Sequence, residues 1–294
     1  MKRKITLFIF FLLCQVNIAQ TKDSTNYHFI FLPAGLNFMP LKAGIDEPRM
    51  GLLYYTGDKN MKVDIGNSVD VFAFDFPKSL SRITIGADFM AYALVTSYLQ
   101  YRLQIDAIDG FFGGNIVYSK KHPGGRFVTR FRYLHSSGHL VDGHWNSETE
   151  SWLNNQLPTA YGNNYADILL AEENVLPFGD IRYYGGFTMS TGKNTGYKYL
   201  KKYLYKAGFE LSYKNLLGKI LNRDENLFVA VNLDVKGIPK YVVNQNYMAG
   251  IKFGNWNNKG IVFYFSYYNG GDVFSQYFTQ RVSRIGFGFM FDFI

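Results

Sequence analysis

The chain ends in Ile285-Gly-Phe-Gly-Phe-Met-Phe-Asp-Phe-Ile294, in which Phe287, Phe289, Phe291 and Phe293 occupy every second position. Successive side chains of a β-strand point to opposite faces, so one face of this segment is aromatic and the other is small or polar. Every strand of a transmembrane barrel turns an apolar face to lipid, whereas a soluble sheet has little use for such a face at its terminus. The stretch therefore predicts the closing strand of a transmembrane β-barrel.

Composition and alternation extend this interpretation to the rest of the chain. Aromatic residues make up 18% of the 294 residues, yet the mean hydropathy is only −0.11. Strands with one apolar and one polar face give this combination because the two faces cancel in the average. Such segments recur at about 47–57, 61–75, 82–93, 101–118, 126–137, 163–173, 180–190, 200–214, 226–236, 244–254, 260–269 and 282–293. They predict an all-β, antiparallel transmembrane β-barrel of about 12 strands over residues 47–294.

The N-terminus has the pattern of a secretory signal. Basic residues at 2–4 precede an apolar stretch over 5–13, which is too short to cross the roughly 30 Å hydrocarbon core as a helix. Residues 1–20 are therefore expected to be cleaved on export to the bacterial outer membrane. The only cysteine, Cys14, lies in this signal, so the mature chain is expected to have no disulfide and no thiolate metal site. Residues 21–46 alternate weakly and are expected to plug the barrel or cover it from the periplasm.

Charge and the C-terminal pattern indicate the partners. The formal net charge is +8, and basic loops beside an anionic lipid surface account for an excess of this kind. The expected partners are outer-membrane lipids and lipopolysaccharide; no nucleic-acid motif is present, and nucleic acid is not expected. The barrel-assembly machinery is expected to recognise the last strand through Phe287, Phe289, Phe291 and Phe293.

The most concentrated polar site lies at the end of the strand predicted over 126–137. Phe131 and Tyr133 share a face with His135 and Ser137, so this face is predicted to be outward. Residues 138–162 form a long loop, and long loops face outside when both termini are periplasmic, which places the pair at the outer leaflet. A histidine and a serine two positions apart project side by side, as a general base and a nucleophile require.

A third residue would have to orient the histidine. Asn164 shares the outward face of the following strand and is the preferred candidate, with Asp142 and Glu148 as alternatives. The blander interpretation is that His135 and Ser137 are interface residues whose polar tips reach lipid headgroups. This second interpretation describes most such pairs in barrel strands.

His135-x-Ser137 resembles the His-x-Ser of outer-membrane phospholipases and of some lipid A deacylases. In those barrels the pair looks out into lipid because the substrate is a lipid. The resemblance implies a lipid esterase with Ser137 as nucleophile, His135 as base and Asn164 as orienting residue. In the phospholipases Asn-Gly follows the serine, whereas Gly138-His139 follows Ser137 here.

Two further constellations carry alternative predictions. His139, Asp142 and His144 are close in sequence and have the side chains that zinc or a similar ion prefers, although their spacing matches no established motif. The lumen-facing residues Arg126, Arg130 and Arg132, with Arg182 nearby and Asp64 and Asp88 as partners, indicate either an anion-attracting channel or an ion-pair network. We favour the ion-pair network.

Several of these motifs recur together in an uncharacterised bacterial family of exported outer-membrane proteins, domain of unknown function 1207. The family's His-x-Ser-Ser-His-Leu-Gly-Asp-Glu resembles His135-x-Ser137-x-His139-Leu140-x-x-Asp142. Further similarity lies in Asn164-Tyr165, in Tyr183-x-Gly185-Gly186, and in Gln276-Tyr-Phe before the Gly286-x-Gly288 strand. The resemblance implies an outer-membrane barrel and no particular activity.

The sequence therefore predicts an outer-membrane barrel for which a structural or passive-transport role is favoured. The alternative is a lipid esterase of the phospholipase or lipid A deacylase type. No cofactor is expected for either. An open, polar lumen would favour transport, and a blocked lumen with an external site at His135 would favour the esterase.

Overall fold

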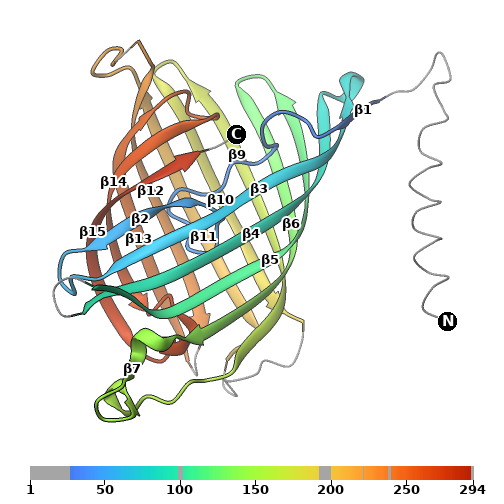
Figure 1. Cartoon of the computed structure of the whole chain (residues 1–294). Coiled ribbons are helices and arrows are strands. Elements are labelled where there is room, and N and C mark those ends of the chain that lie inside the picture. Colours follow the sequence, from blue (N-terminus) through green and yellow to red (C-terminus); the bar gives the residue numbers. More distant parts are fainter. Residues whose placement is uncertain (1–26, 99–101, 192–199, 221, 238–239, 293–294) are drawn as a thin grey trace, which may run out of the picture.

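The computed structural model describes residues 27–98, 102–191, 200–220, 222–237 and 240–292, which form a closed β-barrel (Figure 1). The expected signal over 1–20, with Cys14, and Phe293 of the closing strand lie outside the described residues. Over the described ranges, no helix is long and apolar enough to cross a membrane.

Twelve antiparallel strands form the barrel wall in the described part of the chain. They are β2 (Met50–Tyr55), β3 (Met61–Phe76), β4 (Ser81–Tyr98), β5 (Arg102–His122), β6 (Gly125–Leu140), β9 (Tyr161–Leu176), β10 (Gly179–Ser190), β11 (Tyr203–Lys214), β12 (Glu225–Gly237), β13 (Tyr241–Phe253), β14 (Gly260–Gly271) and β15 (Arg281–Asp292). Each pairs with the next wall strand, and β15 pairs with β2, which closes the ring. The predicted all-β, antiparallel barrel of about 12 strands is confirmed.

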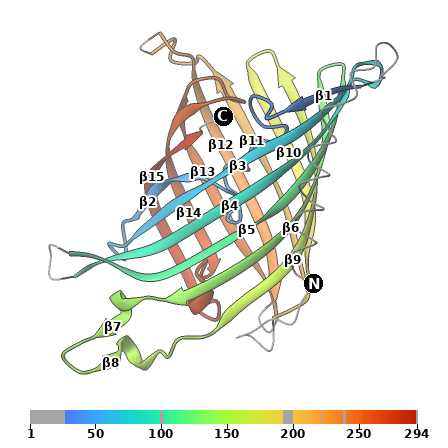
Figure 2. The same ribbon diagram turned by 45° about the vertical axis from the view of Figure 1, so that its right-hand side comes forward.

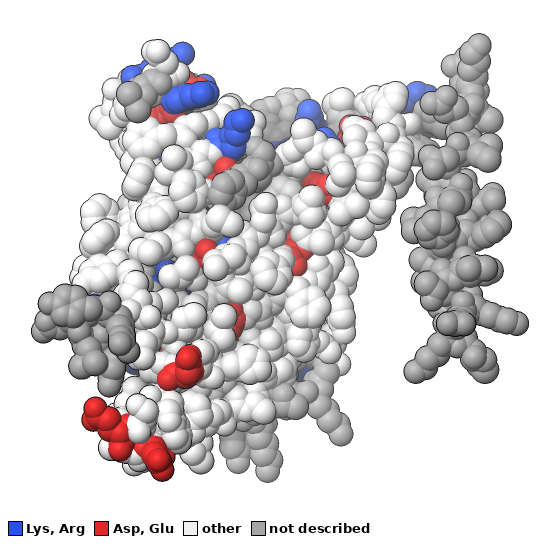
Figure 3. All heavy atoms as spheres, in the orientation of Figure 1, with Lys and Arg blue, Asp and Glu red and all other residues white. Residues whose placement is uncertain are grey.

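The two faces of each wall strand differ in polarity and burial. In β6, Phe131 and Tyr133 are exposed on the outside, whereas Arg130, Arg132 and Leu134 are buried inside. The face of the barrel that Figure 3 shows is mostly uncharged, and the larger groups of charged side chains lie at its upper and lower ends. This distribution is the one that a lipid-facing wall requires.

The closing strand β15 keeps the alternation that identified it. Ile285 and Phe287 expose 58% and 49% of their surface, while Met290 is buried. Asp292, on the inward face, accepts a hydrogen bond from Lys252 at 2.5 Å. The aromatic face is therefore outside, and the polar face contributes to the charged interior.

The connections differ in length at the two ends of the barrel (Figure 2). Tight turns over 77–80, 123–124, 177–178, 215–224 and 254–259 lie at what we call the short-turn end. Gly124 has a φ of +88°, a conformation that favours glycine and allows the two-residue turn from β5 to β6. The opposite, long-loop end carries residues 141–160, with the hairpin β7 (Trp145–Asn146) and β8 (Ser151–Trp152), and residues 272–280, with the 3-10 turn η5 (Ser275–Tyr277).

Part of the chain before β2 runs inside the barrel. β1 (His28–Phe31) pairs with β3 and is exposed, whereas residues 33–49, which we call the lumenal segment, enter the barrel (Figure 1). Phe38 and Leu41 of this segment pack against Val117, Val128 and Leu169 of the wall. The lumenal segment thus supplies part of the apolar core that a closed barrel of this width needs.

Candidate functional site

The outward end of β6 carries the residues that the sequence singled out. Strands β6 and β9 pair with His135 directly opposite Asn164. The Nδ1 atom of His135 lies 2.6 Å from Oδ1 of Asn164, which is a short hydrogen bond. The preferred orienting residue of the sequence prediction is therefore the one that contacts the histidine.

Ser137 faces the same side of β6 two residues further on. Its partners across the two neighbouring strands are Gly110 and Gly162, so no side chain flanks it on either side. Among the described residues no hydrogen bond joins Ser137 to His135. The serine is partly exposed on the outer wall between these two glycines, and we call this position the notch.

Aromatic groups border this notch. The ring of Phe112, which is 58% exposed, lies 5.5 Å from the His135 ring. Tyr133, one step further along the same face, accepts a hydrogen bond from Thr191 at 3.2 Å. The candidate site therefore combines an apolar border with a polar centre, as a surface that binds an amphipathic molecule does.

The predicted metal ligands do not come together. Among the described residues there is no group of three or more His, Cys, Asp or Glu residues that could hold a metal ion. His139 and Asp142 are exposed, whereas His144 is buried with both ring nitrogens engaged. Its Nδ1 lies 2.6 Å from Asp106 and its Nε2 lies 3.0 Å from the carbonyl oxygen of Leu153. The chain turns inward at η3 (Asp142–His144), and this turn separates His144 from His139 and Asp142.

His144 instead belongs to a buried cluster that the sequence did not reveal. Tyr277 of η5 donates a hydrogen bond to Asp106 at 2.5 Å. Burial and this carboxylate raise the pKa of Tyr277 above its usual range. The cluster joins β5, the 141–160 loop and η5, so it fixes the long-loop end of the barrel.

The lumen arginines are paired with carboxylates. Arg130 donates two hydrogen bonds to Glu47 of the lumenal segment, at 2.7 and 2.6 Å. Arg132 is fully buried and donates to Asp167 at 3.2 Å. Burial raises the pKa of Glu47, but attraction to Arg130 and Arg132 outweighs it and lowers the pKa to about 2.

Other lumen contacts tie the same segment to the wall. Arg182 pairs with Glu210 at 2.6 Å and donates to the carbonyl oxygen of Met39 at 2.7 Å. Of the partners named from sequence, Asp88 lies 3.8 Å from Arg132, while Asp64 pairs with a neighbouring lysine. These contacts favour the ion-pair network over an anion channel.

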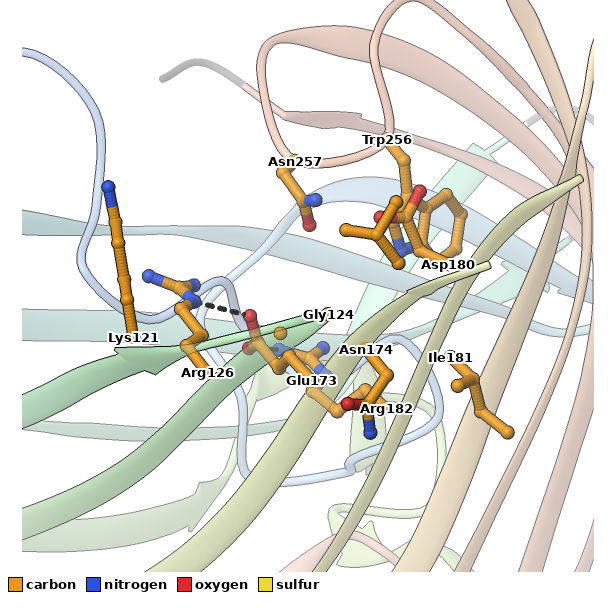
Figure 4. A pocket seen from close by; sticks show the side chains of 12 residues that line it. Lys121, Gly124, Arg126, Glu173, Asn174, Asp180, Ile181, Arg182, Trp256 and Asn257 are labelled. Atoms are coloured by element: carbon orange, nitrogen blue, oxygen red, sulfur yellow. Dashed lines mark hydrogen bonds and ion pairs between the residues drawn. The ribbon is translucent and has the colours of Figure 1, made fainter. Parts of the chain in front are cut away.

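Arg126 lies at the short-turn end. It borders a cavity of about 360 Å³ formed by β5, β6, β9, β10 and the 254–259 turn (Figure 4). Its Nε donates to Glu173 across that cavity at 2.7 Å. Arg126 therefore belongs to the rim of the barrel, unlike Arg130 and Arg132.

Sequence reasoning missed Glu47, the central anion of the lumen network. It lies in the weakly alternating stretch before β2, where strand periodicity gives no side-chain direction. The signal that could have found it is charge balance. The two inward-facing, buried arginines Arg130 and Arg132 require anions, and the segment before β2 contains the carboxylate of Glu47, which no other prediction uses.

The wall, the ion-paired lumen and the outward polar site together define a closed barrel of the outer-membrane type. The chain belongs to the family described as "Protein of unknown function (DUF1207)", whose model matches residues 23–293. No curated protein matches the sequence.

Two solved structures match the chain at low sequence identity. The β domain of the Bordetella autotransporter BrkA is 10% identical, with 83% of this chain and 95% of that chain covered and a TM-score of 0.45. A bacterial polysaccharide outer membrane secretin is 9% identical, with 84% and 99% covered and a TM-score of 0.34.

Proposed function

We propose that this protein is an outer-membrane barrel and that His135, Ser137 and Asn164 form a lipid acyl-hydrolase site on its outer face. The observation that carries the proposal is the 2.6 Å contact between His135 Nδ1 and Asn164 Oδ1. It supplies the base and its orienting group in the arrangement that hydrolases with a serine nucleophile use.

The contact also defines the histidine tautomer. An amide oxygen only accepts hydrogen bonds, so Nδ1 of His135 carries the proton and Nε2 keeps a lone pair. Nε2 can then take the hydroxyl proton of Ser137 as the serine oxygen attacks an ester carbonyl. The imidazolium returns this proton to the leaving alcohol, and a water molecule then releases the fatty acid from the serine by the same route.

The surroundings support a lipid as the substrate. The site faces outward from a wall whose exposed side chains are largely apolar, and Phe112 borders it. Glycines at 110 and 162 leave room beside Ser137 for an ester group. Phospholipids and lipid A are the outer-membrane lipids that carry acyl esters near the headgroup region, where His135 and Ser137 would lie.

A structural role is the second candidate, and the filled lumen supports it. The lumenal segment is held by Arg130 and Arg182, and η5 is held at the long-loop end by Tyr277. This packing argues against an open bore and so against passive transport. A barrel closed in this way is compatible with a site on its outer wall.

The decisive experiment measures acyl release by the purified protein from phospholipid vesicles and from lipid A. Wild type is expected to release fatty acid, and Ser137→Ala is expected to reduce release to background. Ser136→Ala is the matched control, since Ser136 is the adjacent serine on the inward face of β6. No release by wild type, or equal release by Ser137→Ala, rejects the hydrolase and leaves the structural role.

Location and assembly are tested separately. We infer insertion into the outer membrane by the barrel-assembly machinery, with Phe287, Phe289, Phe291 and Phe293 as the recognised face. Phe293→Ala is expected to slow insertion more than deletion of Ile294, measured as the rate at which heat-modifiable protein accumulates in outer membranes. Equal effects of the two changes on the insertion rate would show that the assembly machinery does not recognise Phe293. Recovery of the protein from the soluble periplasm would refute its location in the outer membrane.

A further inference from the structure

A polar cavity lies inside the barrel toward the long-loop end, separate from the outward site. Its two connected lobes measure about 70 and 80 Å³. Asp46, Tyr92, Lys236 and Phe278 line both lobes, and Tyr165 lines the second. We call this cavity the vestibule. Since a buried water molecule needs roughly 10–15 Å³ of such space, each lobe has room for several waters, which is the scale of a single sugar ring.

Two tyrosine hydroxyls in the vestibule have no hydrogen-bond partner among the residues that the structure describes. Tyr92 and Tyr165 are each only 7% exposed. No hydrogen bond to either phenol oxygen exists among the described residues. Buried tyrosine hydroxyls usually find a partner, so two that point into a common cavity indicate that something else in the cavity satisfies them.

Two charged side chains of the vestibule also have no polar partner in the part of the chain that the structure describes. Within the described ranges the carboxylate of Asp46 makes no hydrogen bond or ion pair, and the ammonium group of Lys236 lies within 4 Å of no carboxylate. Lys236 instead sits 3.2 Å from the centre of the Phe278 ring. The vestibule thus presents a free acceptor, a free cation and two free hydroxyls around one space.

The mixture of groups selects the chemical class of ligand. A phosphate or carboxylate would meet Lys236, the cation that lines both lobes, but also the carboxylates of Asp46, Asp109 and Asp234 in the walls. A bound metal cation would be repelled by the nearby ammonium group of Lys236. Sugar hydroxyls both donate and accept, so a neutral sugar can satisfy Asp46, Lys236 and the tyrosines at once.

The aromatic lining supports the same class. Tyr92, Tyr165 and Phe278 give the vestibule apolar surfaces against which the C–H groups of a sugar ring can pack. Lys201 and Lys202, which are exposed in the 200–202 segment, also line the second lobe and mark its approach from the long-loop end. A ligand would enter from that side.

We propose that the vestibule binds a neutral hexose-sized sugar, free or at the end of a saccharide, with Tyr92, Tyr165, Asp46 and Lys236 as its polar contacts. This site is independent of the proposed hydrolase: it lies inside the wall, and its residues differ from those of the outer site. The saccharide is expected to reach it from outside the cell, where the long loops face.

The test is binding of glucose, galactose, mannose and N-acetylglucosamine to the full-length protein in detergent micelles, measured by saturation-transfer NMR and calorimetry. At least one sugar is expected to bind with a dissociation constant on the order of 1 mM or tighter. Tyr92→Phe and Tyr165→Phe are each expected to weaken binding by about fivefold, as the loss of one hydrogen bond does. These variants remove a single oxygen and keep the packing.

Tyr247→Phe is the matched control, because Tyr247 faces outward and its hydroxyl donates to Gln245. It should bind the sugar as wild type does, and all variants should keep heat-modifiable mobility. If no sugar in the panel binds, the vestibule holds water only and the proposal fails. It also fails if both vestibule variants bind like wild type, or if glycine, used as a zwitterionic probe, binds and the sugars do not.

Discussion

His135 and Asn164 are 29 positions apart in the sequence, yet β6 and β9 place them opposite each other with 2.6 Å between Nδ1 and Oδ1. The two strands can pair because the intervening 141–160 connection folds into its own hairpin at the long-loop end. The imidazole is thereby held in one orientation on the outer wall. Substitutions of Asn164 test what this orientation of His135 contributes to acyl release.

Replacement of Asn164 by alanine should lower kcat for acyl release by about tenfold or more, which is part of the 10²–10⁴-fold that a positioned base supplies. KM should change little, because Asn164 contacts the histidine and not the substrate. Asn164→Asp should restore activity and move the acid limb of the pH–rate profile upward, since a carboxylate stabilises the imidazolium.

Thr129→Ala is the control for the Asn164 variants, because Thr129 faces outward on β6, the neighbouring strand that carries His135. It should leave kcat unchanged. An equal loss in Thr129→Ala and Asn164→Ala would assign the effect to altered barrel stability rather than to orientation of His135.

Loss of Glu47 should destabilise the barrel strongly. Glu47→Ala leaves the buried Arg130 without its bidentate partner and removes a nearby anion from Arg132. Breaking a buried ion pair from one side costs about 3–5 kcal/mol in the free energy of unfolding. Urea unfolding in detergent, followed by loss of heat-modifiable mobility, measures this change.

Glu148→Ala, in the exposed part of the 141–160 loop, should change that free energy by no more than about 0.5 kcal/mol. Comparable losses in Glu148→Ala and Glu47→Ala would mean that the Glu47 pairs contribute little and that the lumen network is not what holds residues 33–49.

The same carboxylate predicts a pH dependence. The pKa of Glu47 is lowered from 4.5 to about 2 in the folded protein, so its stabilising contribution is complete above pH 4.5 and is lost as the pH falls toward 2. A depression of this size corresponds to roughly 3 kcal/mol. The difference in unfolding free energy between wild type and Glu47→Gln should therefore shrink between pH 5 and pH 2.5. A difference that stays constant over this range would show that Glu47 does not titrate with its arginine partners.

The architecture was predictable from sequence because strand alternation repeats along the whole chain. All 12 predicted segments correspond to wall strands, and the outward face of β6 follows directly from Phe131 and Tyr133. Register between neighbours then places Asn164 beside His135, because Gly138 pairs with Tyr161 and the antiparallel pairing continues three residues further along both strands. Side chains alternate with a period of two along a strand, so the same alternation predicts that His135 and Ser137 face outward.

The features that the sequence did not predict lie in segments without strand periodicity. The lumenal segment has no repeating pattern, so neither the burial of Glu47 nor its pairing with Arg130 follows from it. Closeness in sequence to His139 predicts that His144 is a metal ligand. The η3 turn, however, points the His144 side chain into the barrel, away from His139. Irregular backbone takes its conformation from tertiary contacts, which a single sequence does not display.

The lumenal segment leads to the last prediction. Because residues 33–49 and their ion pairs fill the barrel interior, wild-type protein in a planar bilayer should show no steady conductance. Replacement of residues 34–44 by a Gly/Ser linker of equal length removes the side chains of Phe38 and Leu41, whose packing holds the Met39 carbonyl against Arg182, but keeps Glu47. This variant should conduct ions while it retains heat-modifiable mobility. Steady conductance in wild type would contradict the closed lumen, and a folded but silent variant would show that the side chains of the wall and η5 are sufficient to close the barrel.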